Sequence, residues 1–336
     1  MCPWTGSDHR PGPGRTRRVL GALSIALLVL AFPGPAAPGP AASGSAASGS
    51  AARTWTPLVE RLVADGLDRA YVEDLYGRAG LQFSPEIMAQ KLRALLNARR
   101  AAAAPEQAGP AQVMGRYLNP VLIAGAFIFF LEHDRDFQII RGRYQVPGEL
   151  LSALFLVETR LGGQLGEEMA MATLSSMAMA RDFAVLEPAL DAGELSPKTE
   201  AWLARRMAQK ADWAYAELRA LILYARENGF DPLTIPGSIF GAIGLCKFVP
   251  TSALVYGVDG DGDGRVDLFG PTDALHSAAN FLHRHGWRRG LGRRDQLEVL
   301  LRYNPSESYA LTIMTVAGRI RRTGQLFGNE SSSRPW

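Results

Sequence analysis

Helical spacing of apolar residues is the feature that most constrains the fold of this chain. Apolar side chains recur three or four positions apart between Trp55 and Val63 and again between Tyr71 and Tyr76, which is the period of a helix face. Ser84-Pro85-Glu86 has the form of a helix start, with proline at the first helical position. Few segments alternate in the manner of strands, and no internal repeat is present. We therefore expect a mainly α fold.

Two further segments qualify this helical pattern. Val121 to Leu131 is strongly apolar, but its 11 residues predict a buried helix because a membrane span needs roughly 20. Ala101 to Gln112 is rich in alanine, proline and glycine, and we expect a surface loop there.

The first 52 residues have the composition of a targeting segment. Arg15, Arg17 and Arg18 precede an uncharged apolar run from Val19 to Phe32, and small residues follow it. This order is typical of a secretory signal peptide, with an uncleaved membrane anchor as the alternative. Only proline, glycine, alanine and serine occur from 33 to 50, which favours a linker. We expect export to the periplasm or cell envelope.

Charge and cysteine usage exclude some function classes. Residues 1–52 hold four of the 36 basic residues and one of the 33 acidic ones, so the remainder is formally neutral. A neutral body argues against nucleic acid as the main partner, since phosphate binding needs surplus Lys and Arg. Past the signal, Cys246 is the one remaining thiol, so we expect no internal disulfide and a buried, unreactive cysteine.

Glu158 is the candidate catalytic residue. It lies in a predicted helix that begins near Val146-Pro147-Gly148, runs to Leu161 and ends at Gly162-Gly163. At about 100° per residue, Leu151, Leu154 and Leu161 lie within roughly 60° of Glu158 around the helix axis. An acid on an apolar stripe has a raised pKa and can donate a proton near neutral pH.

The same position permits a purely structural role for Glu158. A buried glutamate can pair with an arginine, and Arg160 and Arg181 are the candidates. Helix geometry alone therefore leaves catalysis and a structural ion pair both open.

Residues 259–267 read Asp-Gly-Asp-Gly-Asp-Gly-Arg-Val-Asp. Asp259, Asp261 and Asp263 at positions 1, 3 and 5, with glycine at position 6, match the spacing of a calcium loop. Arg265, at position 7, would contribute its backbone carbonyl, and Asp267 is a further candidate ligand. Position 12 is Gly270 instead of glutamate, so Asp273 could close a longer loop. We expect a structural Ca²⁺ clamp, with a solvated acidic turn as the alternative.

Several motifs in order resemble the lytic murein transglycosylase B family of bacterial cell-wall enzymes. The resemblance spans about residues 53 to 328 and rests on motifs in the following order: Tyr144-Gln145-Val146-Pro147, Val157-Glu158-Thr159-Arg160-Leu161-Gly162, Ala172-Thr173-Leu174-Ser175, 236–244 through Lys247-Phe248-Val249-Pro250-Thr251-Ser252, the acidic loop, Asp273-Ala274 through His285-Gly286-Trp287, Tyr303-Asn304 and Ser308-Tyr309-Ala310.

The resemblance implies a lysozyme-like α+β core with an added helical region. It would place an N-terminal helical region at 53–147 and a catalytic core at 148–328, with the calcium loop at 259–273. It also implies cleavage of the MurNAc–GlcNAc bond of peptidoglycan, with Glu158 as the single acid/base and a 1,6-anhydro product. Ser238, Asn304 and Tyr309 would then bind the sugars, and Lys247 is the fourth residue expected to contact the substrate. Glycan strands would be the main partner, with cell-wall biosynthesis proteins as possible others, and the protein would be a monomer.

Three positions depart from the family pattern. Lys247 stands where the family usually has glutamine, Val249 where it has methionine, and Leu161 where it often has tryptophan. A lysine near Glu158 would lower the pKa of that carboxyl. A glycan-binding scaffold without activity and a muramidase that uses water therefore stay open as alternatives.

Overall fold

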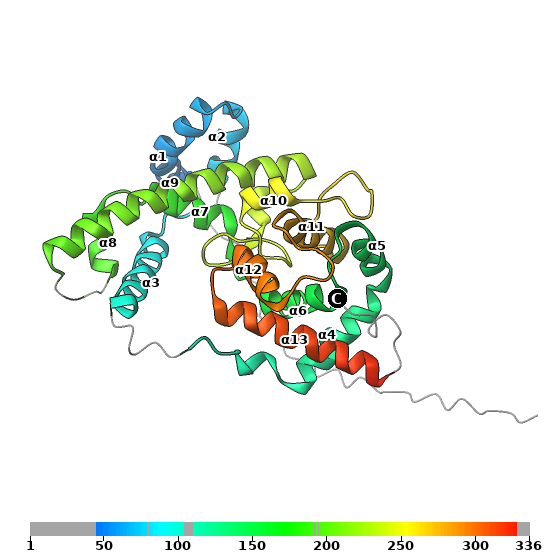
Figure 1. The fold of residues 1–336 in the computed structure, drawn as a ribbon. Helices are drawn as coiled ribbons and strands as arrows, with labels where there is room; N and C mark the ends of the chain where they lie inside the picture. The colour runs from blue at the N-terminus through cyan, green and yellow to red at the C-terminus, as the bar shows by residue number, and fades with distance from the viewer. Residues whose placement is uncertain (1–44, 79–80, 104–109, 191–192, 194, 328–336) are drawn as a thin grey trace, which may run out of the picture. The chain divides into compact units, whose positions relative to one another are not determined.

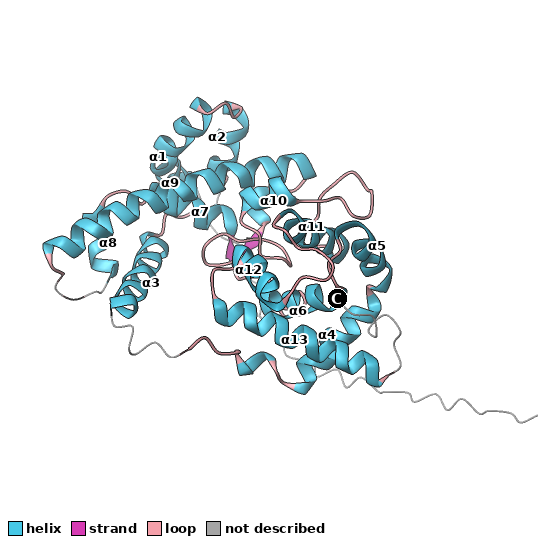
Figure 2. Ribbon diagram, viewed as in Figure 1, coloured by secondary structure: helices cyan, strands magenta, loops and turns pink. Residues whose placement is uncertain are grey.

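The computed structural model describes residues 45–78, 81–103, 110–190, 193 and 195–327, and residues 44–336 cluster as one compact unit. The prediction of a mainly helical fold is confirmed for these residues (Figures 1 and 2). The elements in chain order are α1 (Ser45–Ala64), α2 (Arg69–Gly77), α3 (Pro85–Ala103), the 3₁₀ turn η2 (Gly115–Tyr117), α4 (Pro120–Glu132), α5 (Asp134–Tyr144), α6 (Gly148–Thr159), β1 (Glu168–Met169), α7 (Ala170–Met179), α8 (Phe183–Leu190), α9 (Pro197–Asn228), the 3₁₀ turn η3 (Pro232–Thr234), β2 (Pro236–Gly237), α10 (Pro250–Tyr256), α11 (Pro271–Arg284), α12 (Arg293–Tyr303) and α13 (Glu307–Leu326).

Local sequence explains where many of these helices begin. Helices α3, α4, α9, α10 and α11 each begin with proline, whose fixed φ suits the first turn and whose missing N–H is not needed there. Side chains of Asp68, Asn119, Ser196 and Ser306 accept hydrogen bonds from the first turns of α2, α4, α9 and α13. Such caps each contribute about 1 kcal/mol.

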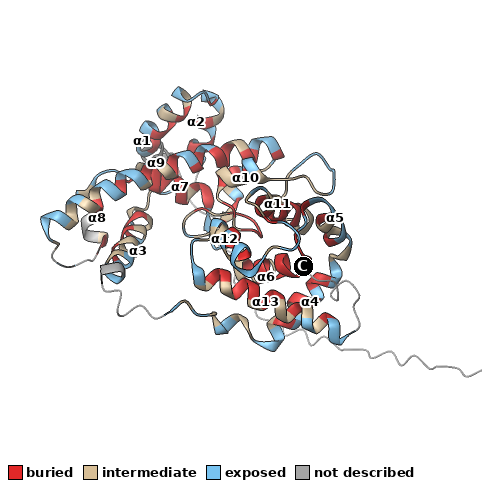
Figure 3. Cartoon of the chain, in the orientation of Figure 1, coloured by how far each residue is buried: buried red, intermediate tan, exposed pale blue. Residues whose placement is uncertain are grey.

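Helix α6 lies at the centre of the core and carries Glu158 near its end. It packs against α4, α5, α11 and α13, and all residues from Gly148 to Leu156 are buried (Figure 3). A Cβ on Gly148 would lie 2.6 Å from the ring of Phe137 and 2.7 Å from that of Phe130, so only glycine fits there. Helix α6, which carries Glu158, is therefore held rigidly by its neighbours.

A short antiparallel sheet pairs two segments far apart in sequence. Strand β1 pairs with β2 in the register Glu168 to Gly237 and Met169 to Pro236. Gly166, with φ +110°, approaches the partner strand so closely that a Cβ would lie 1.9 Å from the carbonyl oxygen of Gly237. This contact fixes the start of the 238–249 loop beside the segment that follows α6.

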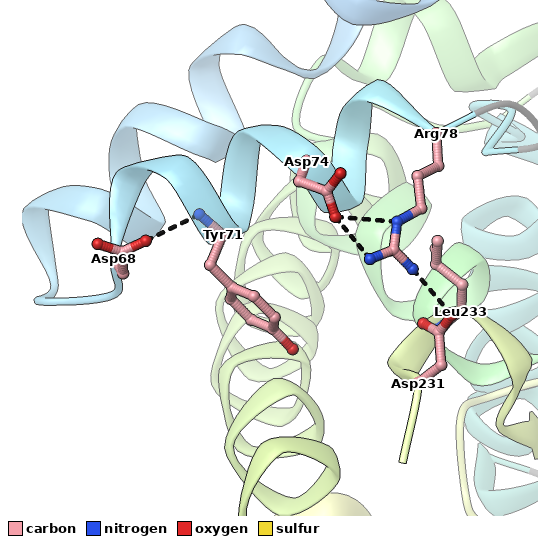
Figure 4. A network of polar contacts seen from close by, with 6 residues as sticks. All are labelled: Asp68, Tyr71, Asp74, Arg78, Asp231 and Leu233. Atoms are coloured by element: carbon pink, nitrogen blue, oxygen red, sulfur yellow. Dashed lines mark hydrogen bonds and ion pairs between the residues drawn. The ribbon is translucent and has the colours of Figure 1, made fainter. Parts of the chain in front are cut away.

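An exposed network ties α2 to the turn before β2 (Figure 4). The Arg78 guanidinium donates to Asp74 at 2.5 Å and to Asp231 at 2.8 Å. Asp231 also accepts a hydrogen bond from the Leu233 N–H, at 3.1 Å. Exposed ion pairs contribute at most about 1 kcal/mol each, so this network orients the segments more than it stabilises them.

The structure differs from several sequence predictions at helix ends. Helix α6 ends at Thr159, not at Leu161, because Arg160 and Leu161 both take left-handed backbone conformations, with φ of +53° and +60°. Helix α1 begins at Ser45, within the stretch expected as linker, where alanine favours helix. Residues 1–44 of the predicted signal and linker and residues 104–109 of the predicted 101–112 loop lie outside the described residues, and α3 continues to Ala103.

The prediction of a fully buried helix at 121–131 is wrong in part. Helix α4 buries Ile123, Phe127 and Phe130 but leaves Val121 and Ile128 exposed. None of the described helices is both long and apolar enough to span a bilayer.

Candidate functional site

Glu158 occupies the last turn of α6, where the helix leaves the core. Its neighbours Leu151 and Leu154 are fully buried, whereas Glu158 itself is partly accessible. Burial is the main cause that raises the pKa of the Glu158 carboxyl to about 7, because loss of water disfavours the charged form. The Glu158 carboxyl can therefore hold a proton near neutral pH.

Tyr309, from the first turn of α13, holds this carboxyl. Its phenol donates a hydrogen bond of 2.5 Å to Glu158 Oε1. The Tyr309 side chain is buried, and its pKa lies well above the ordinary value, first because of burial and then because of the nearby Glu158 charge. The phenol therefore stays protonated and donates, which stabilises the carboxylate and partly offsets the effect of burial on the pKa of Glu158.

Lys247 lies in the 238–249 loop close enough to act on Glu158. Its charge lowers the pKa of the Glu158 carboxyl, although less than burial raises it. The Lys247 ammonium donates to the backbone carbonyl of Leu165, and burial lowers its own pKa. The Thr159 hydroxyl donates to the carbonyl oxygen of Leu245 at 3.2 Å, so the end of α6 and this loop are joined directly.

The other two predicted sugar-binding residues lie on neighbouring loops. The Ser238 hydroxyl oxygen accepts hydrogen bonds from the N–H groups of Phe240 and Ala242, at 3.3 and 3.1 Å, so its own proton is available to a ligand. The Asn304 side chain makes no hydrogen bond with the described residues and is partly accessible. It follows Tyr303, whose phenol donates to the carbonyl of Cys246. Burial raises the pKa of Tyr303 well above its ordinary value, and the nearby Glu158 charge adds to that effect.

Sequence reasoning missed the contribution of η2. After burial and the Glu158 charge, the Tyr117 phenol also raises the pKa of Tyr309. The Arg160 guanidinium lies 5.4 Å from the centre of the Tyr117 ring, a cation–π distance. No periodicity marks Tyr117, because it lies in an irregular segment between α3 and α4.

The structure does not show the ion pair that would make Glu158 purely structural. Arg181 pairs with Asp212, and Arg160 lies over Tyr117. No Lys or Arg in the described ranges lies within ion-pair distance of Glu158. Cys246 is buried, and burial raises the pKa of its thiol to about 12, so it is not a nucleophile at neutral pH.

Three carboxylates of the acidic loop converge. Oxygen atoms of Asp259, Asp261 and Asp273 lie within 4.8 Å of one another. Asp273, in the first turn of α11, is 3% exposed and accepts from the N–H groups of Gly260 and Asp267, both at 2.7 Å. Burial raises its pKa, and the charges of Asp261 and Asp259 add to that effect. A hard cation with oxygen ligands would relieve this repulsion.

The remaining residues predicted as ligands have other contacts. Asp263 lies outside this triad, and its carboxylate accepts from the Arg265 N–H at 2.8 Å. The Arg265 side chain reaches Gly229, at the end of α9. Asp267 accepts from the Phe269 N–H at 2.9 Å. The donor set fits Ca²⁺, with Asp273 as the residue that joins loop and helix.

Comparison with known proteins shows which family this chain resembles. The family model described as "Transglycosylase SLT domain" matches residues 50–296. Membrane-bound lytic murein transglycosylase B of Escherichia coli is 27% identical over 185 residues, which are 55% of this chain and 43% of that protein. The aligned part thus spans less than half of that relative.

Solved structures show the same fold. SltB3 from Pseudomonas aeruginosa, in complex with NAG-anhNAM-pentapeptide, superposes with a TM-score of 0.59 at 18% identity, covering 81% of this chain and 80% of that one. The Escherichia coli lytic transglycosylase Slt35, in complex with calcium, gives 0.58 at 19% identity and covers 80% and 93%. Because the family model spans well over half of the sequence, this chain belongs to the transglycosylase SLT domain family.

Proposed function

We propose that the protein is a lytic transglycosylase that cleaves the MurNAc-β-1,4-GlcNAc bond of peptidoglycan with Glu158 as its general acid and base. The observation that carries this proposal is the Glu158 carboxyl, which is held by Tyr309 and has a pKa of about 7. Such a group can donate a proton and take one back at neutral pH. Family membership supports the reaction class.

Glu158 performs both proton transfers in this reaction. Its protonated Oε2 donates to the glycosidic oxygen as the bond from C1 of MurNAc breaks, while Tyr309 holds Oε1. The C6 hydroxyl of the same MurNAc then attacks C1, and the Glu158 carboxylate removes the proton of that hydroxyl. The product carries a 1,6-anhydro bond, and the enzyme returns to its starting state. Intramolecular attack needs no bound water and gains effective concentration.

The surroundings of Glu158 support a mechanism that uses one catalytic carboxyl instead of two. Glycosidases that use water or a covalent intermediate place a second carboxylate within 5 to 10 Å, roughly. The charged side chain that shifts the pKa of Glu158 is Lys247, a cation and not a second carboxylate. Ser238 and Asn304 have hydrogen-bonding groups free for the sugar hydroxyls and amides.

Calcium has a structural role in this proposal. Asp259, Asp261 and Asp273 would hold Ca²⁺, with a backbone carbonyl from Arg265. The cation would fix the loop to α11 and would supply no chemistry at Glu158. The calcium complex of Slt35 supports the assignment by fold similarity. Export to the periplasm or cell envelope, where peptidoglycan lies, fits the expected signal peptide.

Mass spectrometry of sacculus digests tests the proposal. The wild-type protein should release anhydro-ended muropeptides, and Glu158→Gln should release almost none although its melting temperature is no lower than that of the wild type. Reducing-end products would support the water-using muramidase. Equal, negligible release by both proteins, with retained binding to sacculi, would support the scaffold.

A further inference from the structure

An apolar stripe lies exposed on the outer face of α4. Val121 is 76% exposed, Ile128 54% and Leu131 45%, and Ala124 is exposed as well. These four positions lie within roughly 80° of one another around the helix axis. A surface helix normally exposes polar residues to water on its outer side. The exposed apolar stripe therefore indicates a binding surface.

The end of α13 continues the stripe. Helices α4 and α13 pack side by side (Figure 1), and Leu326 and Phe327, at the end of α13, are 86% and 77% exposed. Residues of the two helices line a shallow, open hollow of about 470 Å³. Its lining residues are Pro120, Ile123, Ala124, Arg319, Arg322, Thr323 and Leu326. We call the surface formed by Val121, Ala124, Ile128, Leu131 and Leu326 the α4–α13 face.

Arginines border this face. Arg322 also lines the next hollow, of about 510 Å³, together with Arg293 and Arg321. Gln296 links that hollow to a third, of about 360 Å³, which Arg141, Arg288 and Arg289 line. Within the described chain, no Asp or Glu lines any of the three hollows. Glu132, at the end of α4, is the acid that lies next to the stripe.

We propose that the α4–α13 face binds the surface of an anionic lipid bilayer. Its apolar side chains would enter the boundary between head groups and acyl chains, and the bordering arginines would contact lipid phosphates. An exposed apolar helix face beside basic residues is the pattern of proteins that lie on a membrane. A second copy of the chain is not expected to bind this face, because a two-fold dimer would bring the arginines of one copy close to the same arginines of the other.

This attachment would set the orientation of the candidate active site. Tyr309 and Leu326 lie at opposite ends of α13, and a helix rises 1.5 Å per residue, so roughly 25 Å separates them. The Tyr309–Glu158 pair would then work at a fixed height above the lipid surface. The lipid binding itself does not depend on catalysis by Glu158.

Vesicle sedimentation tests the proposal. The experiment uses the chain from Gly44 onward, because that part clusters as one compact unit. The apolar run at 19–32 is left out because it could bind lipid by itself. Circular dichroism melting verifies that the shortened protein is folded. This protein should bind vesicles made of phosphatidylcholine and phosphatidylglycerol in equal parts. It should bind far more weakly to vesicles of phosphatidylcholine alone. The triple change Val121→Ser, Ile128→Ser and Leu131→Ser should lower the partition coefficient at least tenfold.

A matched pair of variants separates the apolar and electrostatic contributions. Arg322→Gln should lower binding to the anionic vesicles about fivefold. Val185→Ser and Arg205→Gln, both at exposed positions on other helices, should change nothing. Failure of the unchanged protein to bind anionic vesicles would overturn the proposal. So would a dimer in analytical ultracentrifugation that the triple change dissolves, because a second copy would then be the occupant.

Discussion

The acidic loop and the Glu158 site use the same functional group in opposite surroundings. Asp259 lies in the exposed loop, and hydrogen bonds from the backbone, that of Gly264 first, lower its pKa. Glu158 lies at the edge of the core, and burial raises its pKa to about 7. The first carboxyl stays charged and is suited to a cation, whereas the second holds a proton near neutral pH. Solvent and backbone contacts, not residue type, thus decide the role of each acid.

Loss of the acid at Glu158 should have the largest effect. Glu158→Gln keeps the shape of the side chain but has no exchangeable acid proton, so kcat should fall by about 10³-fold. Release of soluble muropeptides from sacculi measures this effect. Activity within tenfold of the unchanged protein would place the catalytic acid elsewhere.

Removal of calcium should act on stability. If Asp259, Asp261 and Asp273 bind Ca²⁺, the ion at a hundredfold excess over its Kd contributes about 2.7 kcal/mol. Chelation should then lower Tm by about 5–10 °C, as measured by calorimetry. Asp273→Asn should lower Tm in the same direction and abolish the response to calcium. A response that survives Asp273→Asn would exclude this residue as the ligand that closes the site.

The raised pKa of Glu158 should also affect the pH dependence of stability. The folded state holds its proton up to about pH 7, whereas the unfolded chain loses it near 4.5. This carboxyl therefore destabilises the fold as the pH rises above 4.5. Glu158→Gln should be more stable than the unchanged protein at pH 8, by about 1–3 kcal/mol, and equally stable at pH 4. Glu227→Gln, at an exposed position, is the control in urea unfolding and should show no such difference.

Removal of the Tyr309 hydroxyl should have an intermediate effect. Its hydrogen bond lowers the pKa of Glu158, so Tyr309→Phe should move the alkaline fall in activity to higher pH. The loss of positioning should lower kcat by about 10- to 100-fold, since one charge-assisted hydrogen bond contributes about 1.5–3 kcal/mol. A pH–rate profile that falls at the same pH in both proteins would exclude this contact.

The change with the smallest expected effect concerns Lys247. Its charge lowers the pKa of Glu158, so Lys247→Gln should raise that pKa. The alkaline fall in activity would move upward, while Lys247→Arg should leave it in place. A downward shift for Lys247→Gln would contradict the electrostatic role assigned to this lysine.

The two regions also differ in how much of each could be predicted from sequence. The acidic loop lies within 15 consecutive residues, so its spacing alone predicts Asp259, Asp261 and Asp263 as ligands, with Asp273 as the end of a longer loop. Of these four, Asp263 lies outside the carboxylate triad. Helix periodicity likewise placed Glu158 among buried leucines. Periodicity could not show that α6 stops at Thr159, because that end depends on the left-handed conformations of two ordinary residues.

Long-range contacts account for what sequence reasoning missed. Tyr309 meets Glu158 across 151 positions of sequence, and only the family resemblance indicated that residue. No motif marked Tyr117. The exposed face of α4 is not predictable from sequence, because an apolar run of 11 residues does not reveal which of its sides meets the core.

The central claim is that one carboxyl, protonated near neutral pH because it is buried, carries the reaction. The pH dependence of kcat/KM on sacculi tests it most directly, because this parameter reports ionisations of the free enzyme. The account predicts that kcat/KM falls as the pH rises through about 7 and that this fall moves upward in Tyr309→Phe. A profile that stays level to pH 9, or that falls near 4.5 as for an exposed glutamate, would contradict it.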